Sequence, residues 1–402
     1  MKCIKRKNQL FVKYKQNKSV YNERRYKSYK YSLQKVLRNT EKAHYSDLIN
    51  QNRKCIKKTC NIIKDLIDTK DIVNTNEFII NGVRVSDPSI VSNGFNEYFI
   101  NVGPKLAALI PPINIDNTKT PPSIPSTMFI SDITHAELLN VINDLKNSGS
   151  GCDLIKPIAL KLIAGAICEP LLHIFNLSFR NGIVPYQLKV ARVVPIFKKG
   201  NCQLIENYRP ISILSSLSKV LERLVYNRVI AFLHKHNVLT ECQYGFRKKY
   251  STYMPLVHLL DKIHKALDNG NHVIGLFLDL SKAFDTVDHS ILLNKLQCYG
   301  LRGNIFNWFK DYLSERTQYV EFKDSVSGTG EIVCGVPQGS MLGPLLFLIY
   351  VNDLPLQSSL LNTIMFADDS NLFLQGSDMN AMEDIFNTEL AHIVHWFHAN
   401  KL

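Results

Sequence analysis

One short segment constrains the fold of this chain more than any other. Residues 361–375 read LNTIMFADDSNLFLQ, in which adjacent carboxylates stand between two runs of strand-forming residues. Aspartate tolerates turn geometry, so the pattern predicts a β-hairpin whose turn is built on Asp368, Asp369 and Ser370. Taken alone, the segment is compatible with an ordinary polar turn and with the tip of a metal-binding hairpin.

Composition limits the classes of protein to consider. A chain of 402 residues is long enough to hold two or three domains, and a content of 45% hydrophobic and 21% charged residues is typical of a globular protein. No apolar run reaches the roughly 18 residues of a membrane span, so we expect no membrane partner. The basic start, MKCIKRKNQL, lacks the apolar segment of a secretory signal. Nine scattered cysteines without a C-x-x-C pair favour reduced intracellular thiols over a zinc site or disulfides.

The positive charge is concentrated at the N-terminus. Of the 48 Lys and Arg residues in the chain, 20 lie in residues 1–75, which hold only 6 Asp and Glu; the remaining residues are close to neutral. Tyrosines and phenylalanines are interleaved with these cations, as expected for a segment that follows a phosphate backbone and packs beside bases. A solvated helical face explains the same pattern.

The order of segments indicates more than one domain. Residues 26–70 have helical composition, and short strands and another helix follow. The Pro-rich stretch 110–126 reads as a linker, because proline favours an extended backbone. Helices and strands then alternate, with Ser131 or Asp132 as a candidate N-cap for the first helix.

A second acidic position precedes the hairpin. The run VIGLFLDL within residues 272–300 is apolar enough to be a buried strand, yet Asp279 stands at its end. An unpaired buried carboxylate is costly, which favours a bound cation, although a simple strand end is an equal alternative. Asp288 is better explained as a helix N-cap, and Asp285 as a structural residue.

Strand and hairpin together suggest a reaction. If they lie in one sheet, the carboxylates of Asp279, Asp368 and Asp369 converge at one edge. Such oxygen ligands suit Mg²⁺, which completes its shell with water and substrate phosphates. Two metal ions about 3.5–4 Å apart can activate a 3′-hydroxyl and stabilise leaving pyrophosphate. The pattern therefore predicts nucleotidyl transfer.

Between the acids lies a glycine-rich loop. Residues 334–355, CGVPQGSMLGPLLFLIYVNDLP, begin with glycines that allow close approach of a ligand and continue as an apolar helix. Gln338 in this loop could contact a nucleotide base or sugar. A simple helix-entry turn is the alternative.

Read together, several segments resemble one family. "LDLSKAFDTVDH", "GVPQGSMLGPLLF" and "FADD" are similar to the blocks of reverse transcriptases of non-LTR retrotransposons, the LINE-type and in particular the jockey-like elements. Upstream, "LKVARVVPIFKKGN", "ENYRPISILSSLSKVLERLV" and "QYGFRKKYST" match the fingers blocks in order, and "VSNGFNEYFINVGPKLA" resembles the preceding linker. The resemblance covers roughly residues 80–402.

The resemblance implies roles for individual residues. The acids that match the family's metal ligands and catalytic residues are Asp279, Asp368 and Asp369. The positions that match nucleotide contacts are Phe284 beneath the sugar, Gln338 and Gly339 in the loop, and Lys198 and Arg209 at the triphosphate. Lys199 competes with Lys198 for its role, and Arg247 and Lys248 are the candidate nucleic-acid contacts.

The resemblance also implies an architecture. We expect an α/β (α+β) right-hand polymerase with fingers, an antiparallel palm sheet carrying helices on one face, and a basic helical region before them. The expected divisions are a basic linker region at 1–120, a fingers extension at 121–177 and a reverse transcriptase domain at 178–402. Complete family members carry an endonuclease before these parts and a thumb after them, and neither is recognisable here.

The implied activity is that of an RNA-directed DNA polymerase. Its cofactors would be two Mg²⁺ ions, for which Mn²⁺ could substitute. Its partners would be an RNA template, a DNA primer and deoxynucleoside triphosphates, and its place of action intracellular and nuclear; the oligomeric state is open. One alternative is an inactive nucleic-acid-binding remnant of such an element. Another, an RNA-templated RNA polymerase, is disfavoured by the bulky Phe284 at the sugar position.

Overall fold

The structure divides into two compact units. This computed structural model describes residues 2–53, 55, 58–59, 62–63, 75–111, 119 and 121–402. The first unit is Met1–Asn74 and the second is Thr75–Leu402. Within the described ranges, no helix combines the length and the apolar character needed to cross a membrane. The described cysteines are all free thiols.

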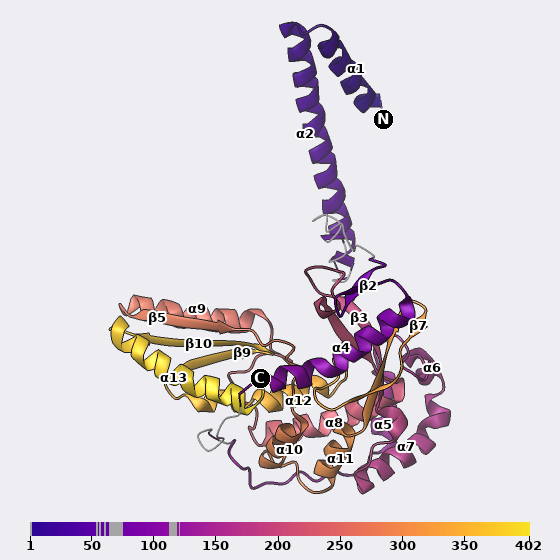
Figure 1. Ribbon diagram of the computed structural model, residues 1–402, viewed down its shortest axis with the longest axis vertical. Coiled ribbons are helices and arrows are strands. Elements are labelled where there is room, and N and C mark those ends of the chain that lie inside the picture. The colour runs from indigo at the N-terminus through magenta and orange to yellow at the C-terminus, as the bar shows by residue number, and fades with distance from the viewer. Residues whose placement is uncertain are drawn as a thin grey trace. The chain divides into compact units, whose positions relative to one another are not determined.

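The first unit contains two helices, α1 (Lys2–Gln16) and α2 (Val20–Gln51), which pack against each other (Figure 1). Ser19 begins α2, since its hydroxyl accepts a hydrogen bond from the backbone N–H of Asn22 at 3.3 Å. The helix predicted over 26–70 is confirmed as far as Gln51; most of the remaining stretch lies outside the described residues.

The second unit alternates helices and strands. Its helices are α4 (Pro88–Ala108), α5 (His135–Asn143), α6 (Pro157–Leu162), α7 (Ala164–Asn181), α8 (Ser216–Lys235), α9 (Tyr253–Asp268), α10 (His289–Cys298), α11 (Asn304–Leu313), α12 (Gly343–Val351) and α13 (Met379–Ala399), with 3-10 turns η2 (Tyr186–Leu188), η3 (Ile205–Asn207) and η4 (Leu354–Gln357). Its strands are β1 (Phe78–Ile80), β2 (Val83–Val85), β3 (Val190–Phe197), β4 (Tyr208–Ile213), β5 (His272–Leu278), β6 (Arg316–Phe322), β7 (Ser325–Val326), β8 (Gly330–Ile332), β9 (Asn362–Phe366) and β10 (Asp369–Gly376).

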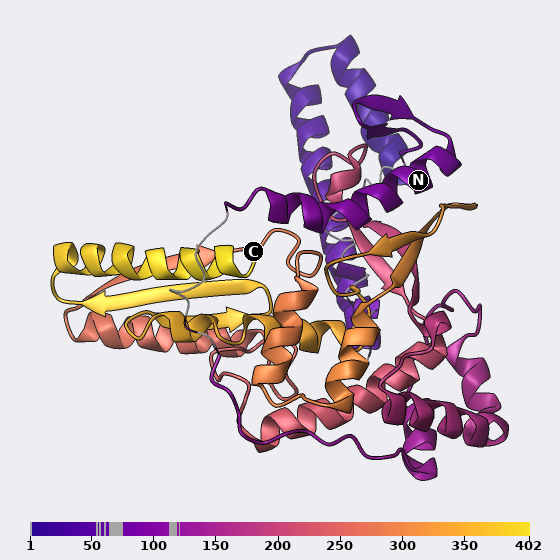
Figure 2. The ribbon, with the colours of Figure 1, turned by 60° about the horizontal axis from the view of Figure 1, so that its bottom comes forward.

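A three-stranded antiparallel sheet carries the predicted acids. Its order is β5-β10-β9, so the hairpin and the earlier strand do share one sheet. Both ribbon views show this sheet between α9 and α13 (Figures 1 and 2). The expectation of helices on one face is therefore wrong. The strands carry apolar side chains on both faces: Leu276 packs on the main core, and Phe277 points to the opposite face, towards α9.

The position of β5 also differs from the prediction. It is an edge strand, and Phe277 is 69% exposed, so the strand is not buried as its apolar sequence suggested. Asp279, which follows it directly, is exposed. Its carboxylate therefore does not bear the desolvation cost assumed from the sequence.

The second sheet joins distant parts of the chain. Its order is β4-β3-β6-β7, with β8 also paired to β6, and β3 runs parallel to β6. The buried rings of Phe78, Phe95 and Phe99 pack against this sheet as a separate apolar cluster. Residues 75–110 thus belong to the second unit, and the structural division falls at Asn74, well before the Pro-rich segment. The functional division of the chain remains a prediction.

Helix starts follow local hydrogen bonding. Asp288 caps α10 as predicted, with its carboxylate accepting from the N–H groups of Ser290 and Ile291 at 2.9 and 3.0 Å. The cap of α5 is Thr134 and not Ser131 or Asp132, because only its hydroxyl is placed to accept from the Glu137 N–H.

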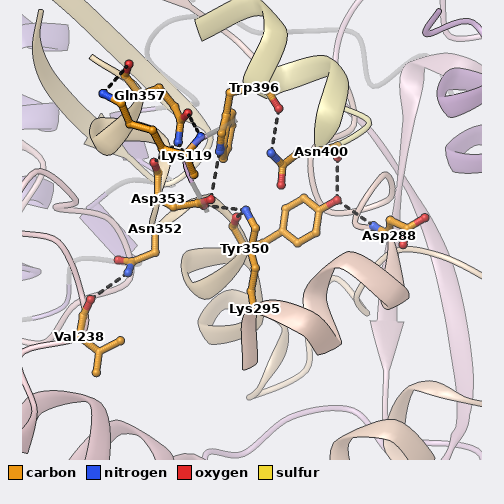
Figure 3. A network of polar contacts seen from close by, with 10 residues as sticks. All are labelled: Lys119, Val238, Asp288, Lys295, Tyr350, Asn352, Asp353, Gln357, Trp396 and Asn400. Carbon is orange, nitrogen blue, oxygen red and sulfur yellow. Dashed lines mark hydrogen bonds and ion pairs between the residues drawn. The ribbon is translucent and has the colours of Figure 1, made fainter. Parts of the chain in front are cut away.

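A buried polar network fastens α13 to the rest of the unit (Figure 3). The ammonium group of Lys295 lies 2.6 Å from an oxygen of Asp353, whose other oxygen accepts from the indole N–H of Trp396 at 3.1 Å. The Tyr350 hydroxyl donates to the carbonyl of Asn400 at 2.6 Å. Because these groups satisfy one another, a charged pair can be accommodated within the core.

Candidate active site

The hairpin turn differs by one residue from its predicted position. β9 ends at Phe366 and β10 begins at Asp369, so Ala367 and Asp368 form the turn. Ala367 has a φ of 56°, the left-handed conformation that two-residue hairpin turns require. Asp369 is thus the first strand residue and not part of the turn.

A second segment holds this turn in place. The buried amide of Gln243 accepts from the N–H of Ala367 at 2.9 Å and donates to its carbonyl at 3.2 Å. Gly245 lies so close that a Cβ atom there would stand 2.2 Å from the Ala367 nitrogen. The QYGF segment therefore clamps the hairpin tip, a role that its sequence did not reveal.

Sheet register brings the acids to one end of the sheet. Ser370 of β10 is paired with Leu278 of β5, so the adjoining residues Asp369 and Asp279 lie across from one another. Both line one open pocket, together with Phe366 and Thr252. The prediction that the strand and the hairpin lie in one sheet, with Asp279 and Asp369 at the same end, is confirmed.

The neighbouring acids affect the protonation of Asp369. Burial raises the pKa of the Asp369 carboxyl, and the negative charges of Asp368 and Asp279 raise it further. Among the described residues, no three His, Cys, Asp or Glu side chains converge closely enough to form a complete metal-binding group. The acids are thus neighbours at one sheet end without a preformed protein cage.

The glycine-rich loop lies against β4 of the other sheet. The N–H of Ser212 donates to the carbonyl of Gln338 at 2.7 Å. Gly339 has a φ of 120°, and a Cβ atom there would stand 2.5 Å from the Ser212 carbonyl oxygen. Glycine is therefore required at 339 by backbone conformation and by close approach to β4.

Phe284 lies over the core beneath this loop. Its ring stacks on Phe347 of α12, with centroids 4.8 Å apart, and meets the edge of Phe246 at 5.8 Å. It is only partly buried. The ring therefore has a fixed orientation and an open side.

Cations gather at the β3–β4 connection. Lys198 follows β3, Lys199 comes next, and Arg209 lies in β4; all three are exposed. Burial is the largest influence on the Lys282 ammonium group and lowers its pKa. The negative charge of Asp285 opposes this effect, whereas the positive charges of Lys198 and Arg209 lower the pKa further.

Lys282 was missed by sequence reasoning, although it stands in the same block as Asp279. Its ammonium group donates to the carbonyls of Glu206 and Tyr208 at 3.1 and 3.3 Å. Its place three residues after Asp279 was the available signal.

The two candidate nucleic-acid contacts differ. The guanidinium of Arg247 donates to the carbonyls of Thr240 and Gln243 at 2.8 and 3.1 Å and lies over the Tyr250 ring. It is therefore engaged within the chain. Lys248 is exposed.

A match to a protein-family model identifies the family of this chain. Residues 196–402 match the family model described as reverse transcriptase (RNA-dependent DNA polymerase), which is half of the chain, and the chain belongs to this family. The mixed helix-and-sheet fold, with its three-stranded antiparallel sheet, fits the fingers and palm of such an enzyme.

Similar proteins indicate which group of reverse transcriptases the chain resembles. The chain is 34% identical over 216 residues to a probable RNA-directed DNA polymerase from transposon X-element of Drosophila melanogaster, covering 54% of this chain and 24% of the relative. The probable RNA-directed DNA polymerase from transposon BS of the same species is 34% identical, and the match covers 60% of this chain and 26% of the relative. The RNA-directed DNA polymerase from mobile element jockey is 32% identical, and the match covers 56% of this chain and 25% of the relative. The predicted resemblance to non-LTR retrotransposon enzymes is confirmed. The chain spans about a quarter of the length of these relatives.

Proposed function

We propose that this chain forms the fingers and palm of an RNA-directed DNA polymerase of a non-LTR retrotransposon, which extends a DNA primer on an RNA template. The observation that carries the proposal is the β5-β10-β9 register, which sets Asp279 beside Asp369 and the turn residue Asp368. A carboxylate cluster at the end of a palm sheet has no evident packing role. It suits a reaction in which phosphate charge must be neutralised.

The donor set fits divalent metal ions. Mg²⁺ binds few protein carboxylates and keeps ligand positions for water and phosphate, so neighbouring carboxylates at one end of a sheet suit it. Asp279, Asp368 and Asp369 would hold two Mg²⁺ ions, or Mn²⁺ in their place. When bound, the metal ions would supply positive charge at the attacking and leaving oxygens.

Other residues of the chain would bind and orient the nucleotide. Lys198 and Arg209, with Lys282 beside them, would neutralise the triphosphate, with Lys199 as the competing choice. Phe284 presents a rigid ring on which the deoxyribose would pack, leaving no room for a 2′-hydroxyl. Gln338 and Gly339 would contact the nucleotide and the template base.

Nucleic-acid contacts would extend beyond the palm. Lys248 and the basic first unit would bind phosphates, and Arg247 would contribute only after releasing its internal hydrogen bonds. Residues 121–177 would extend the fingers, and residues 1–120 would form a basic linker region before them. The place of action would be the nucleus, where a DNA primer is found.

The second candidate is a nucleic-acid-binding protein without catalysis. The observation that favours it is the basic first unit, which alone would give salt-dependent binding. Primer extension distinguishes the two functions: the chain is incubated with poly(rA), oligo(dT), dTTP and Mg²⁺, with and without chelator. We expect Mg²⁺-dependent incorporation that Asp368→Asn abolishes. Tight template-primer binding without incorporation would support the second candidate.

A further inference from the structure

Asp285 lies beneath the glycine-rich loop in an unusual environment. One carboxylate oxygen accepts a hydrogen bond from the side-chain amide nitrogen of Gln338 at 2.9 Å. The other oxygen is buried and has no hydrogen-bond partner among the described residues. A carboxylate in this situation is costly.

The surrounding groups offset this cost only in part. The Lys282 ammonium group donates to the backbone carbonyls of Glu206 and Tyr208 and forms no ion pair with Asp285. The thiol of Cys334 donates to the backbone carbonyl of Asp285 at 3.4 Å and not to its carboxylate. Burial raises the pKa of the Tyr98 hydroxyl, which also lies near enough for the charge of Asp285 to raise it further. A residue kept only for packing would be better served by an uncharged side chain.

We propose that Asp285 is a positioning residue, which sets the face of the Gln338 amide that is turned toward the incoming nucleotide. This inference rests on the proposed function and deepens it, because it explains how one of the nucleotide contacts is oriented. It also assigns a role to a residue for which the sequence suggested only a structural one.

The chemistry of the pair gives the mechanism. An ionised carboxylate can only accept hydrogen bonds, so the amide nitrogen of Gln338 must face it and the amide oxygen must lie on the opposite side of the planar group. The site would then offer an acceptor to a hydrogen-bond donor of the nucleotide. A protonated acid or an asparagine can donate as well as accept, so that either amide orientation becomes possible.

The loop backbone is held independently of this contact. The carbonyl of Gln338 is fixed by the Ser212 N–H, and the N–H of Met341 donates to the buried carboxylate of Glu222 at 2.7 Å. Loss of the Asp285 charge should therefore release the amide orientation without moving the loop.

Protonation should have the same effect as substitution. Burial raises the pKa of the Asp285 carboxyl to about 6, opposed by the Gln338 hydrogen bond and the charge of Lys282. Nucleotide affinity of the wild-type chain should therefore fall as the pH drops below about 6, while Asp285→Asn should remove this dependence.

The test compares four full-length chains: wild type, Asp285→Asn, Gln338→Ala and the double variant. The dissociation constant for dTTP is measured on poly(rA) with a dideoxy-terminated oligo(dT) primer, so that no turnover is needed. We expect Asp285→Asn to weaken dTTP binding about threefold to tenfold, the range of one hydrogen bond. The same substitution should have no further effect when Gln338 is already alanine. Asp288→Asn, in which asparagine still caps α10, is the matched control and should bind like wild type.

Two results would overturn the inference. Unchanged dTTP affinity in Asp285→Asn, or additive effects in the double variant, would show that Asp285 does not act through Gln338, with the polymerase assignment intact. Failure of the wild-type chain to bind dTTP on template-primer would refute the proposed function, and this inference with it.

Discussion

The carboxyl group of Asp285 makes the stability of the folded chain depend on pH. Because the pKa of Asp285 is raised in the folded chain to about 6, the folded state holds a proton that the unfolded state releases near pH 4. The free energy of unfolding should therefore fall as the pH rises through this window.

The Asp285→Asn variant should not lose stability in this way as the pH rises. We expect the variant to be more stable than wild type by at most about 3 kcal/mol at pH 8, with a much smaller difference at pH 4. Urea unfolding at both pH values measures this. Equal stability at pH 8 would mean that the carboxylate is better compensated than its contacts indicate.

Phe284 provides a second test at the scale of one residue. Phe284→Val shortens the side chain under the proposed sugar site, so incorporation of ribonucleotides relative to deoxynucleotides should rise about tenfold or more. The substitution also loses stacking on Phe347. Phe347→Leu is therefore the control, since it disturbs the same packing and should leave sugar selectivity unchanged. The sugar-gate role would be refuted by equal selectivity in all three proteins.

Residue roles were predictable from the sequence only where they depend on neighbours in the chain. The N-cap at Asp288 was identified because its partners follow within three residues. The pairing of Asp285 with Gln338 spans 53 residues, and that of Lys282 with Glu206 spans 76. Such partners are brought together by the fold and leave no local pattern.

At the scale of elements, runs of apolar, strand-forming residues predicted the hairpin and the β5 strand. It did not give their register or the one-residue shift of the turn, because both depend on pairing with β5 and on the Gln243 clamp. Nor did apolar content reveal that β5 is an edge strand: a run of apolar residues describes a strand's capacity for burial, and neighbouring elements decide whether burial occurs.

The attachment of α13 rests on the network of Figure 3. Asp353→Asn removes the partner of the buried Lys295 ammonium group, so the free energy of unfolding should fall by about 3–5 kcal/mol. The double variant Lys295→Met, Asp353→Asn leaves no unpaired charge and should regain part of this loss. Chemical denaturation measures both. A double variant less stable than the single one would contradict this view of the network.

At the scale of the whole molecule, the sequence placed the excess charge correctly but not the structural boundary. Prolines suggested a division near 110–126, whereas the aromatic side chains of β1 and α4 join the second unit. A high proline content shows where the backbone can adopt an extended conformation. Long-range packing of residues such as Phe95 decides which segments fold together.

The basic first unit should contribute salt-dependent binding. Lys13, Arg24, Lys30 and Arg38 are exposed on α1 and α2. Replacing all four by glutamine should weaken the salt dependence of binding to single-stranded RNA: the slope of log K against log salt should become less negative by up to about 3. Glutamine at exposed lysines of the second unit, such as Lys105 and Lys310, is the control. An unchanged slope would show that the unit is merely a solvated surface.

The proposed function depends on catalysis by three carboxylates at the end of the palm sheet. Its most direct test is single-turnover incorporation of dTTP on poly(rA) and oligo(dT) with Mg²⁺ by wild type, Asp279→Asn, Asp369→Asn and the control Asp378→Asn, which keeps a helix-capping side chain on α13. We expect a rate loss of about a thousandfold or more for the first two variants and a wild-type rate for the control. Incorporation by Asp279→Asn or Asp369→Asn within a few-fold of wild type would contradict it.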